Sequence, residues 1–447
     1  MRTGTANGNT RLQMWRRVRE YAVPPSMILT ATARRSVGDW AGACAAARVA
    51  VDLDLRDVAR RHGRELATAL RADLRRLAPD LLRWHLPRVA PDGLLRPGLT
   101  VTLARYPAAE GAAPLHLVLR TSPAWADDAQ RVALALWDPL RPEADTRRHP
   151  HPHPSRRFRL DLHRHLWDAR NSVELGERSG TAELTEPAER GSWATDRWAD
   201  EARLLLRAER RASGRVAVRL GRREALLLDL DEDGTLTASV TTPAEARNPD
   251  LLLLPDAAVF VPPDLELLRA GLIDADALHP LVAAALLPGH VPAGRPAVDA
   301  SAPRVVPVEC RGERHRLAVV GGVLRPLDHG PEELRREELL VALTGTPLPC
   351  LQAIDQAHRS PEGLDELRRR LDHGDLAGFT AVLAALIGPD AVLPAGALRD
   401  ELDAARLRRI DYALYRAGLP APPSGAVSGR TARRRAQRTR RQPAPRR

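Results

Sequence analysis

The chain contains no lysine: all 68 basic residues among its 447 residues are arginine. A Walker-type phosphate loop is excluded, because its lysine contacts the phosphates, and Schiff-base chemistry is excluded because it needs a lysine amine. Aromatic residues make up only 3% of the sequence, so leucine, valine and alanine must fill the core. This composition is typical of a GC-rich bacterial genome. The abundance of arginine is therefore, by itself, weak support for anion recognition.

Cysteine is also scarce. Cys44, Cys310 and Cys350 lie far apart and form no C-x-x-C pair. This pattern favours reduced thiols in the cytoplasm over a disulfide framework. Residues 1–19 lack the apolar centre of a signal peptide, and the longest apolar stretches, such as 281–287, are far shorter than the ~20 residues that span a bilayer. We expect a cytoplasmic protein with no membrane association and no cofactor.

The positive charge is concentrated at one end of the chain. The formal net charge is +11, and residues 421–447 hold nine arginines and no acid, which leaves +2 for the first 420 residues. A segment of Gly, Pro, Ser and Arg cannot bury enough apolar area to fold, so we expect a disordered tail. Such a tail can bind polyanions without reading sequence. The candidate nucleic-acid contacts are Arg433, Arg434, Arg435, Arg438, Arg440 and Arg441.

Hydrophobic periodicity predicts an α+β fold. Helical spacing covers most of the first 95 residues, and alternation with a period of two follows at 99–106, 115–120, 131–137 and 158–162. Three more alternating runs, at 215–220, 224–230 and 234–240, predict a β-meander. The expected organisation is a disordered extension (1–13), a helical domain with a small antiparallel sheet (14–180), a β-meander with helices (190–300), a β-hairpin with a helical bundle (301–420) and the tail (421–447).

A histidine-rich segment is the first candidate site. His149, His151 and His153 alternate with prolines, and His163 and His165 follow. Imidazoles are good ligands for zinc, copper or nickel, and Asp161 or Asp168 could add a carboxylate ligand or a base. The simpler interpretation is a stiff, solvated polyproline-like connector. The weak metal candidates are His151, His153, His163, His165 and Asp161.

Two acidic motifs resemble metal loops. Asp229, Asp231 and Asp233 with Gly234 begin like a calcium loop, but Val240 occupies the twelfth position, where a bidentate glutamate is needed. A hairpin turn is the better interpretation. Asp52 and Asp54 form a D-x-D pair immediately before a predicted helix, where an aspartate commonly serves as N-cap.

Two cysteine–histidine pairs are candidates for a thiolate nucleophile and its base. His315 lies across a predicted turn from Cys310, and His358 follows Cys350 by eight residues. Both cysteines also lie among apolar residues and prolines, which fits simple packing. The catalytic residues of the chain, if it has any, stay unknown at this level.

No motif identifies a characterised family or a reaction. The leading hypothesis is a non-catalytic accessory or adaptor protein that acts through protein–protein contacts with an unidentified partner. One alternative is a metal-dependent hydrolase or nuclease that uses residues 149–168. Another is a nucleic-acid-associated protein that binds through its tail.

Overall fold

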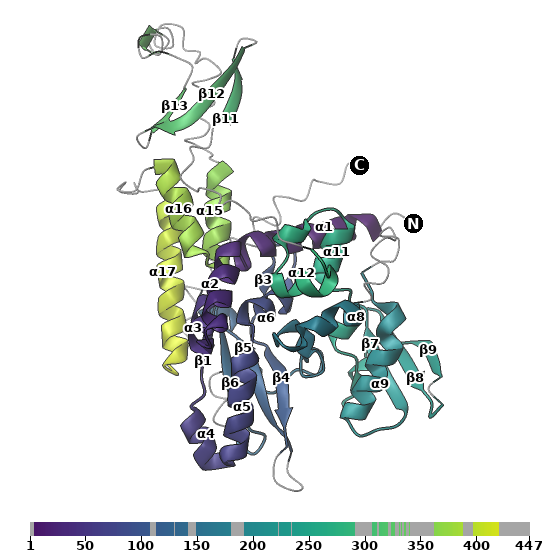
Figure 1. The fold of residues 1–447 in the computed structure, drawn as a ribbon. Coiled ribbons are helices and arrows are strands. Elements are labelled where there is room, and N and C mark those ends of the chain that lie inside the picture. Colours follow the sequence, from purple (N-terminus) through teal and green to yellow (C-terminus); the bar gives the residue numbers. More distant parts are fainter. Residues whose placement is uncertain are drawn as a thin grey trace. The chain divides into compact units, whose positions relative to one another are not determined.

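The computed structural model combines helices with several small sheets (Figure 1). The mixed α/β class predicted from the sequence is confirmed. Within the expected helical bundle, the sequence also predicts helices at 332–343 and 348–358. The second of these, most of the first and the arginine-rich tail lie outside the described residues. The structure describes residues 4–107, 113–128, 130–141, 149–179, 192–221, 223–233, 235–290, 306–310, 313–320, 323–326, 330, 332, 335, 336, 339, 362–387 and 397–419.

The chain divides into two compact units. The first comprises Met1–Val291 and Arg408–Arg447, and the second Pro292–Leu407. The finer division of the first unit near residues 180–190 stays a prediction. The helices of the first unit are α1 (Gly4–Arg17), continued by a π-helical turn (Val18–Ala22), α2 (Pro25–Ser36), α3 (Trp40–Ala46), α4 (Leu55–His62), α5 (Arg64–Arg76), α6 (Pro79–His85), α8 (Leu175–Ser179), α9 (Trp198–Ala208), α10 (Asp256–Val259), α11 (Pro263–Arg269) and α12 (Pro280–Leu286).

The N-terminal helix starts earlier than the sequence predicts. A disordered extension is expected over residues 1–13, but α1 begins at Gly4. Its C-terminal half is held in place by side-chain contacts. Arg11 forms an ion pair with Glu266 at 3.3 Å and lies over the Phe260 ring, and Leu12 packs against the main core. These partners are some 250 residues away in sequence, so local periodicity could not reveal them.

The first sheet has the strand order β1-β6-β5-β4. The predicted antiparallel strands are confirmed, whereas β1 pairs in parallel with β6 and escapes the sequence analysis because it has only three residues. Its strands are β1 (Val49–Val51), β4 (Thr100–Tyr106), β5 (Leu115–Thr121) and β6 (Val132–Trp137). A separate two-residue pair joins β2 (Arg88–Val89) to β3 (Leu94–Leu95).

The predicted strand at residues 158–162 is wrong. Ser155 and Leu160 donate backbone hydrogen bonds to the carbonyls of Thr100 and Thr102 in β4. Because the segment advances much further than β4 between these two contacts, a continuous ladder cannot form. A single bridge, from Thr102 to Arg159, is the result.

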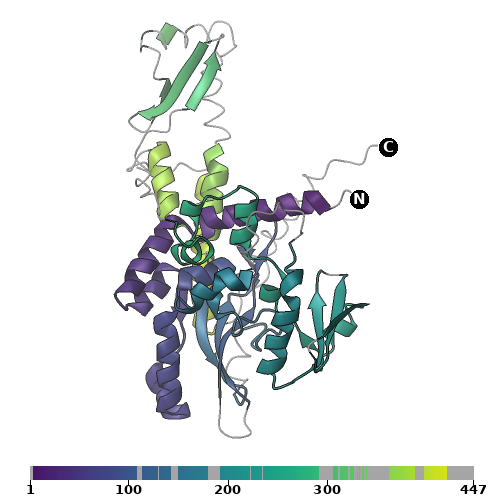
Figure 2. The same ribbon diagram turned by 45° about the vertical axis from the view of Figure 1, so that its right-hand side comes forward.

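The second sheet confirms the predicted meander. Its strands follow the order β10-β7-β8-β9, and β7, β8 and β9 are antiparallel neighbours. Helix α9 covers one face, where Leu205 and Leu206 pack against Val216 and Leu228. In both views α9 lies between the first sheet and the second (Figures 1 and 2). The strands are β7 (Gly214–Arg219), β8 (Ala225–Leu230), β9 (Leu236–Thr241) and β10 (Leu252–Leu253).

One large hydrophobic core joins distant parts of the first unit. It contains Val18 near the start of the chain, the fully buried Trp84 of α6, and Val282 and Leu286 of α12. Short 3₁₀ turns connect the elements around it. These turns are η2 (Ala124–Ala126), η3 (Arg164–Leu166), η4 (Asn171–Glu174), η6 (Thr195–Arg197), η7 (Glu245–Arg247) and η8 (Ala275–Ala277).

The second unit holds a three-stranded sheet and helices. The predicted hairpin is confirmed as β11 and β12, and β13 extends it. Helices α15 and α16 bury Leu367, Leu371 and Phe379 between them. The elements are β11 (Val306–Cys310), β12 (Glu313–Val320), β13 (Val323–Pro326), α15 (Glu362–His373), α16 (Leu376–Ile387) and α17 (Ala397–Arg416), whose last residues belong to the first unit.

A Gly-Asp turn connects helices twice, and the sequence repeats the pattern Gly-Asp-x-Ala-Gly at residues 38–42 and 374–378. Gly38 and Gly374 have φ of 77° and 76°, which a side chain would strain, and each ends a helix. The following residues, Asp39 and Asp375, cap the next helix through the backbone N–H three residues on. Within the part of the chain that the structure describes, no helix is both long and apolar enough to cross a bilayer.

Candidate functional site

The histidine-rich segment is partly drawn into the fold. His149 is 3% exposed, and its Nε2 lies 3.0 Å from the carbonyl oxygen of Thr121. His151 and His153 are exposed, and the His153 ring lies edge-on to Trp137. These contacts lie on the first sheet, whereas His163 and His165 turn toward α8 and α9.

His163 belongs to a closed ionic network around Glu201 of α9. The Glu201 carboxylate lies 3.1 Å from His163 Nε2 and accepts hydrogen bonds from Arg178 and Arg197 at 2.7 Å each. Burial raises the pKa of Glu201, but the hydrogen bond and charge of His163, with the guanidinium of Arg178, lower it to about 2. The network ties α8, η6 and α9 together, so its first role is structural.

His165 stands beside this network without joining a ligand set. Its ring lies edge-on to His163 at 5.8 Å between centroids, and the side chain is buried. Burial, and then the neighbouring His163, lower the pKa of His165 well below its ordinary value. Asp161 is engaged elsewhere, because both of its oxygens accept hydrogen bonds from Arg159, at 3.0 and 2.7 Å.

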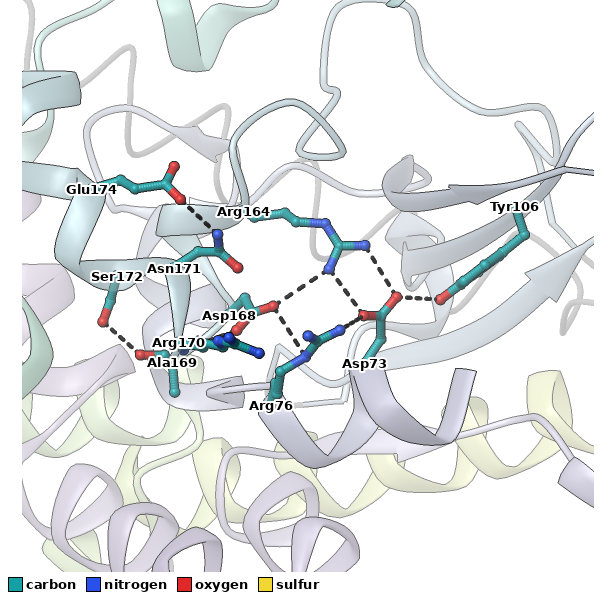
Figure 3. A network of polar contacts seen from close by, with 10 residues as sticks. All are labelled: Asp73, Arg76, Tyr106, Arg164, Asp168, Ala169, Arg170, Asn171, Ser172 and Glu174. Carbon is teal, nitrogen blue, oxygen red and sulfur yellow. Dashed lines mark hydrogen bonds and ion pairs between the residues drawn. The ribbon is translucent and has the colours of Figure 1, made fainter. Parts of the chain in front are cut away.

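Asp168 lies in a second network, at the junction of α5, β4 and η3 (Figure 3). Arg76 and Arg164 bridge Asp168 and Asp73, and Tyr106 donates a hydrogen bond to Asp73 at 2.6 Å. Burial raises the pKa of Asp73, yet the hydrogen bonds from Arg164 and Tyr106 outweigh this and lower it. Each carboxylate has arginine partners, as expected of buried ions that hold elements together.

These partners leave no ligand set in the histidine-rich segment. Among the described residues, no three His, Cys, Asp or Glu side chains are grouped so that they could hold a metal ion. The metal-dependent hydrolase or nuclease stays a prediction, and this geometry adds no support to it.

The acidic motifs have local roles. Asp54 caps α4 by accepting a hydrogen bond from Arg56 N at 2.8 Å. Asp231 accepts one from Thr235 N in the turn between β8 and β9, which confirms the hairpin. In the second unit, the register places His315 opposite Val308, while Cys310 pairs with Glu313. Cys350 and His358 lie outside the described residues.

Asp52 and His149 meet at a pocket of the first unit that the sequence does not predict. Asp52 forms an ion pair with Arg416, and the cavity has a volume of about 370 Å³. Burial raises the pKa values of both tyrosines in its wall. The lining residues that bring polar groups are Asp52, Arg120, Thr121, Ser122, His149, Tyr412, Tyr415 and Arg416. Asp52 is already paired and His149 is bonded to the backbone, so the pocket offers no nucleophile with an adjacent base.

Strand β9 forms an outer edge of the second sheet (Figure 1). Its sequence, Leu-Thr-Ala-Ser-Val-Thr, contains no charged residue and no proline. The four residues 237–240 are exposed, and Val240 is 88% exposed. Natural edge strands usually carry charge or proline, or are kept short, because an open edge pairs with other chains.

The other edges of these two sheets are protected. Residues 155–160 cover the outer side of β4 with hydrogen bonds, β1 has three residues and β10 has two. β9 has six residues and stands alone at its edge. Sequence alternation reveals the strand, but it cannot reveal that this strand is the outermost one.

The hydrogen-bond pattern shows which groups β9 leaves open. The Asp231 N–H donates to the Thr235 carbonyl oxygen, and antiparallel pairs alternate between bonded and non-bonded positions. Thr237, Ser239 and Thr241 therefore bond to β8. The N–H and C=O groups of Leu236, Ala238 and Val240 point outward, away from the sheet.

Comparison with known proteins gives no relative for this chain. No family model, no curated protein and no solved structure matches it.

Proposed function

We propose that this protein is a non-catalytic accessory protein that acts in the cytoplasm through protein–protein contacts, with β9 as its contact strand. The observation that carries the proposal is the uncharged outer edge of β9, with three residues whose backbone groups point outward. Addition of a strand to such an edge is a common mode of protein recognition, because the backbone supplies the hydrogen bonds. The scarce and widely spaced cysteines support the cytoplasmic location.

The partner that best fits this edge is β9 of a second copy. The five residues Leu236 to Val240 run apolar, hydroxyl, alanine, hydroxyl, apolar, so the strand has nearly the same chemistry in both directions. An antiparallel pair centred on Ala238 places Leu236 against Val240 of the second copy and Thr237 against its Ser239. Such apolar and hydroxyl cross-strand pairs are stabilising.

The backbone geometry agrees with this register. The backbone N–H and C=O groups of Leu236, Ala238 and Val240 point away from β8. A two-fold axis beside Ala238 therefore brings these residues together as the hydrogen-bonded pairs of the dimer. Leu236 packs partly against the core under α9, and Val240 shares its face of the strand. Pairing would therefore extend this apolar face into the second copy and cover Val240. A single strand pair buries little area, so we expect a weak, reversible dimer.

A charge-swap experiment tests both the surface and the register. In Ala238→Lys, two like charges face each other directly across the axis, and the same holds for Ala238→Glu. We expect each variant alone to be monomeric by sedimentation velocity, while wild-type protein dimerises in the same concentration series. An equimolar mixture of the two variants should restore the dimer through Lys–Glu pairs.

The matched control is Val37→Lys, which adds the same charge at another exposed apolar position, 77% exposed after α2. It should dimerise like wild type. A wild-type chain that stays monomeric at the highest concentration would overturn self-association. If the mixture fails to recover while each variant is monomeric, the pairing is not centred on Ala238.

A further inference from the structure

We propose that the folded body carries a phosphate-binding site formed by Arg96 and Arg157, which lie over the ring of Phe158, together with Arg219 and Arg247. The site is separate from the arginine-rich tail and does not depend on the pairing of β9. Its ligand is a phosphate-bearing anion, and the observations favour the backbone of a single-stranded nucleic acid.

Four separate segments contribute to the cluster. Arg157 and Phe158 belong to the segment that crosses the edge of β4, and Arg96 precedes that strand. Arg219 ends β7 and Arg247 ends η7. Leu254 N donates to Ala217 O of β7 and Asp256 N donates to Arg157 O, so the end of β7 lies near Arg157. Arg156 donates to the carbonyl oxygen of Asn248, the residue after Arg247. The Cζ atoms of Arg96 and Arg157 lie 5.7 and 5.1 Å from the centroid of the Phe158 ring, so the ring holds both guanidinium groups.

The cluster has too little negative charge. Arg157 pairs with Asp256 at 2.6 Å, whereas no carboxylate among the described residues forms an ion pair with Arg96, Arg219 or Arg247. The Nε of Arg219 is buried without a hydrogen-bond partner. Burial lowers the pKa of Arg219, and the charges of Arg157, Arg247 and Arg96 lower it further against the opposing effect of Asp256. The positive charge of these arginines is therefore only partly balanced by Asp256.

The arginine bias of the chain does not explain this arrangement. Elsewhere in the first unit, many half-buried arginines have a carboxylate within 4 Å, and Arg19, Arg83 and Arg88 donate to backbone carbonyl oxygens instead. The paired examples are Arg11, Arg105, Arg159, Arg164, Arg178 and Arg197. Like charges gathered without a counter-ion destabilise a fold, so the cluster is best accounted for by an anion that binds it.

Phosphate suits the cluster better than a single carboxylate would. A guanidinium is a planar fork that donates two hydrogen bonds to phosphate oxygens, and several forks can share one phosphate or neighbouring ones. Arg96 and Arg247 are exposed, so an extended chain could reach them. The proposed contacts of the four arginines are to phosphate oxygens, and none is to the edge of a base. We therefore expect binding without sequence preference.

The test compares full-length variants in their binding of a fluorescent single-stranded oligonucleotide over a salt series. The triple variant Arg96→Gln, Arg219→Gln and Arg247→Gln should reduce the slope of log K against log salt by about 2, since each phosphate contact on a single strand contributes about 0.7. The matched control replaces three carboxylate-paired arginines, Arg60, Arg203 and Arg406, with glutamine. It should leave the slope close to that of wild type.

Two further measurements distinguish binding by the tail from binding by the cluster, and a nucleic acid from a free phosphate as the ligand. Replacing the tail arginines 433–435 with glutamine should lower the slope on its own, while the further loss caused by the triple variant persists. If wild type binds no oligonucleotide, but inorganic phosphate raises the Tm of wild type and not that of the triple variant, the ligand of the site is a free phosphate. The triple variant should have an unchanged or higher Tm, because it removes repulsion. The proposal is overturned if the triple variant behaves like its control, or if wild type binds neither probe.

Discussion

The carboxylate of Glu201 should make the stability of the first unit depend on pH. Its pKa is about 2 in the folded protein, against an ordinary value of 4.5. A depressed carboxylate pKa stabilises the fold above the unfolded-state value, and this contribution is lost as the pH falls through the folded-state value. The side chain is 3% exposed, so solvent screens the interaction little.

The size of this contribution follows from the shift. At about 1.4 kcal/mol per pKa unit, the ionised Glu201 contributes about 3 kcal/mol at pH 7. Linkage reduces this to about half by pH 3, with most of the loss below pH 4.5. Glu201→Gln removes the charge but keeps the shape, and it leaves Arg178, Arg197 and His163 facing one another without a counter-charge. We therefore expect this variant to be less stable than wild type by about 3 kcal/mol at neutral pH.

The assay is urea unfolding of wild type and Glu201→Gln at pH values from 7 to 3.5, followed by tryptophan fluorescence. The difference in free energy of unfolding should shrink as the pH falls, because protonated Glu201 resembles glutamine. Asp200→Asn is the matched control, since Asp200 lies on the same helix, is 78% exposed and pairs with Arg203. Its effect should stay within about 0.5 kcal/mol at every pH. A Glu201→Gln difference that is constant across the series would refute this reasoning.

Three smaller predictions concern single contacts. Asp54→Ala removes the cap of α4 and should lower the free energy of unfolding by about 1 kcal/mol in urea, and a change of only a few tenths would contradict the capping role. Tyr106→Phe removes the hydrogen bond to the carboxylate of Asp73 and should cost about 1.5–3 kcal/mol in the same assay, whereas the half-buried control Tyr412→Phe should cost less. Burial raises the pKa of the Cys44 thiol to about 12, so iodoacetamide should modify the Cys44 peptide far more slowly in native than in urea-unfolded protein; equal rates by mass spectrometry would contradict this burial.

Local pattern predicted the elements whose signal is contained in their own residues. Helix α17, at 397–416, falls within the helical bundle expected over 301–420, and the meander of β7, β8 and β9 follows its alternation and turns. The N-caps at Asp39 and Asp54 were likewise predictable from their place before a helix. The segment at 158–162 misled the analysis because its alternation serves contacts with β4, not a ladder. Periodicity reports which residues are buried, and it does not report what buries them.

The sites depend on partners that no local pattern contains. Glu201 meets His163 across 38 positions, and Arg219 meets Arg96 across more than a hundred. In the sequence, the excess of positive charge is evident only in the tail. The net charge of the first 420 residues is close to zero, and this sum hides a local cluster of arginines. In the fold, several buried carboxylates are matched to arginines, as at Asp73, whereas the cluster at Phe158 is left with one acid.

The same contrast explains why both proposals fall on the second sheet and its border with the first. At the first sheet, residues 155–160 cover the outer edge at β4, and the buried Asp73 and Asp168 are paired with arginines. The second sheet retains an uncovered strand in β9 and, where β7 ends, the unpaired charge of Arg219. Both features lower the stability of an isolated chain, the first by exposing Val240 and the second by repulsion. The two features need partners of different chemistry. An uncharged strand can pair with the open backbone groups of β9, whereas only an anion can balance the charge of Arg219. Salt should therefore weaken binding at the arginines while leaving the pairing of β9 largely unchanged, and this separates the two surfaces in one titration.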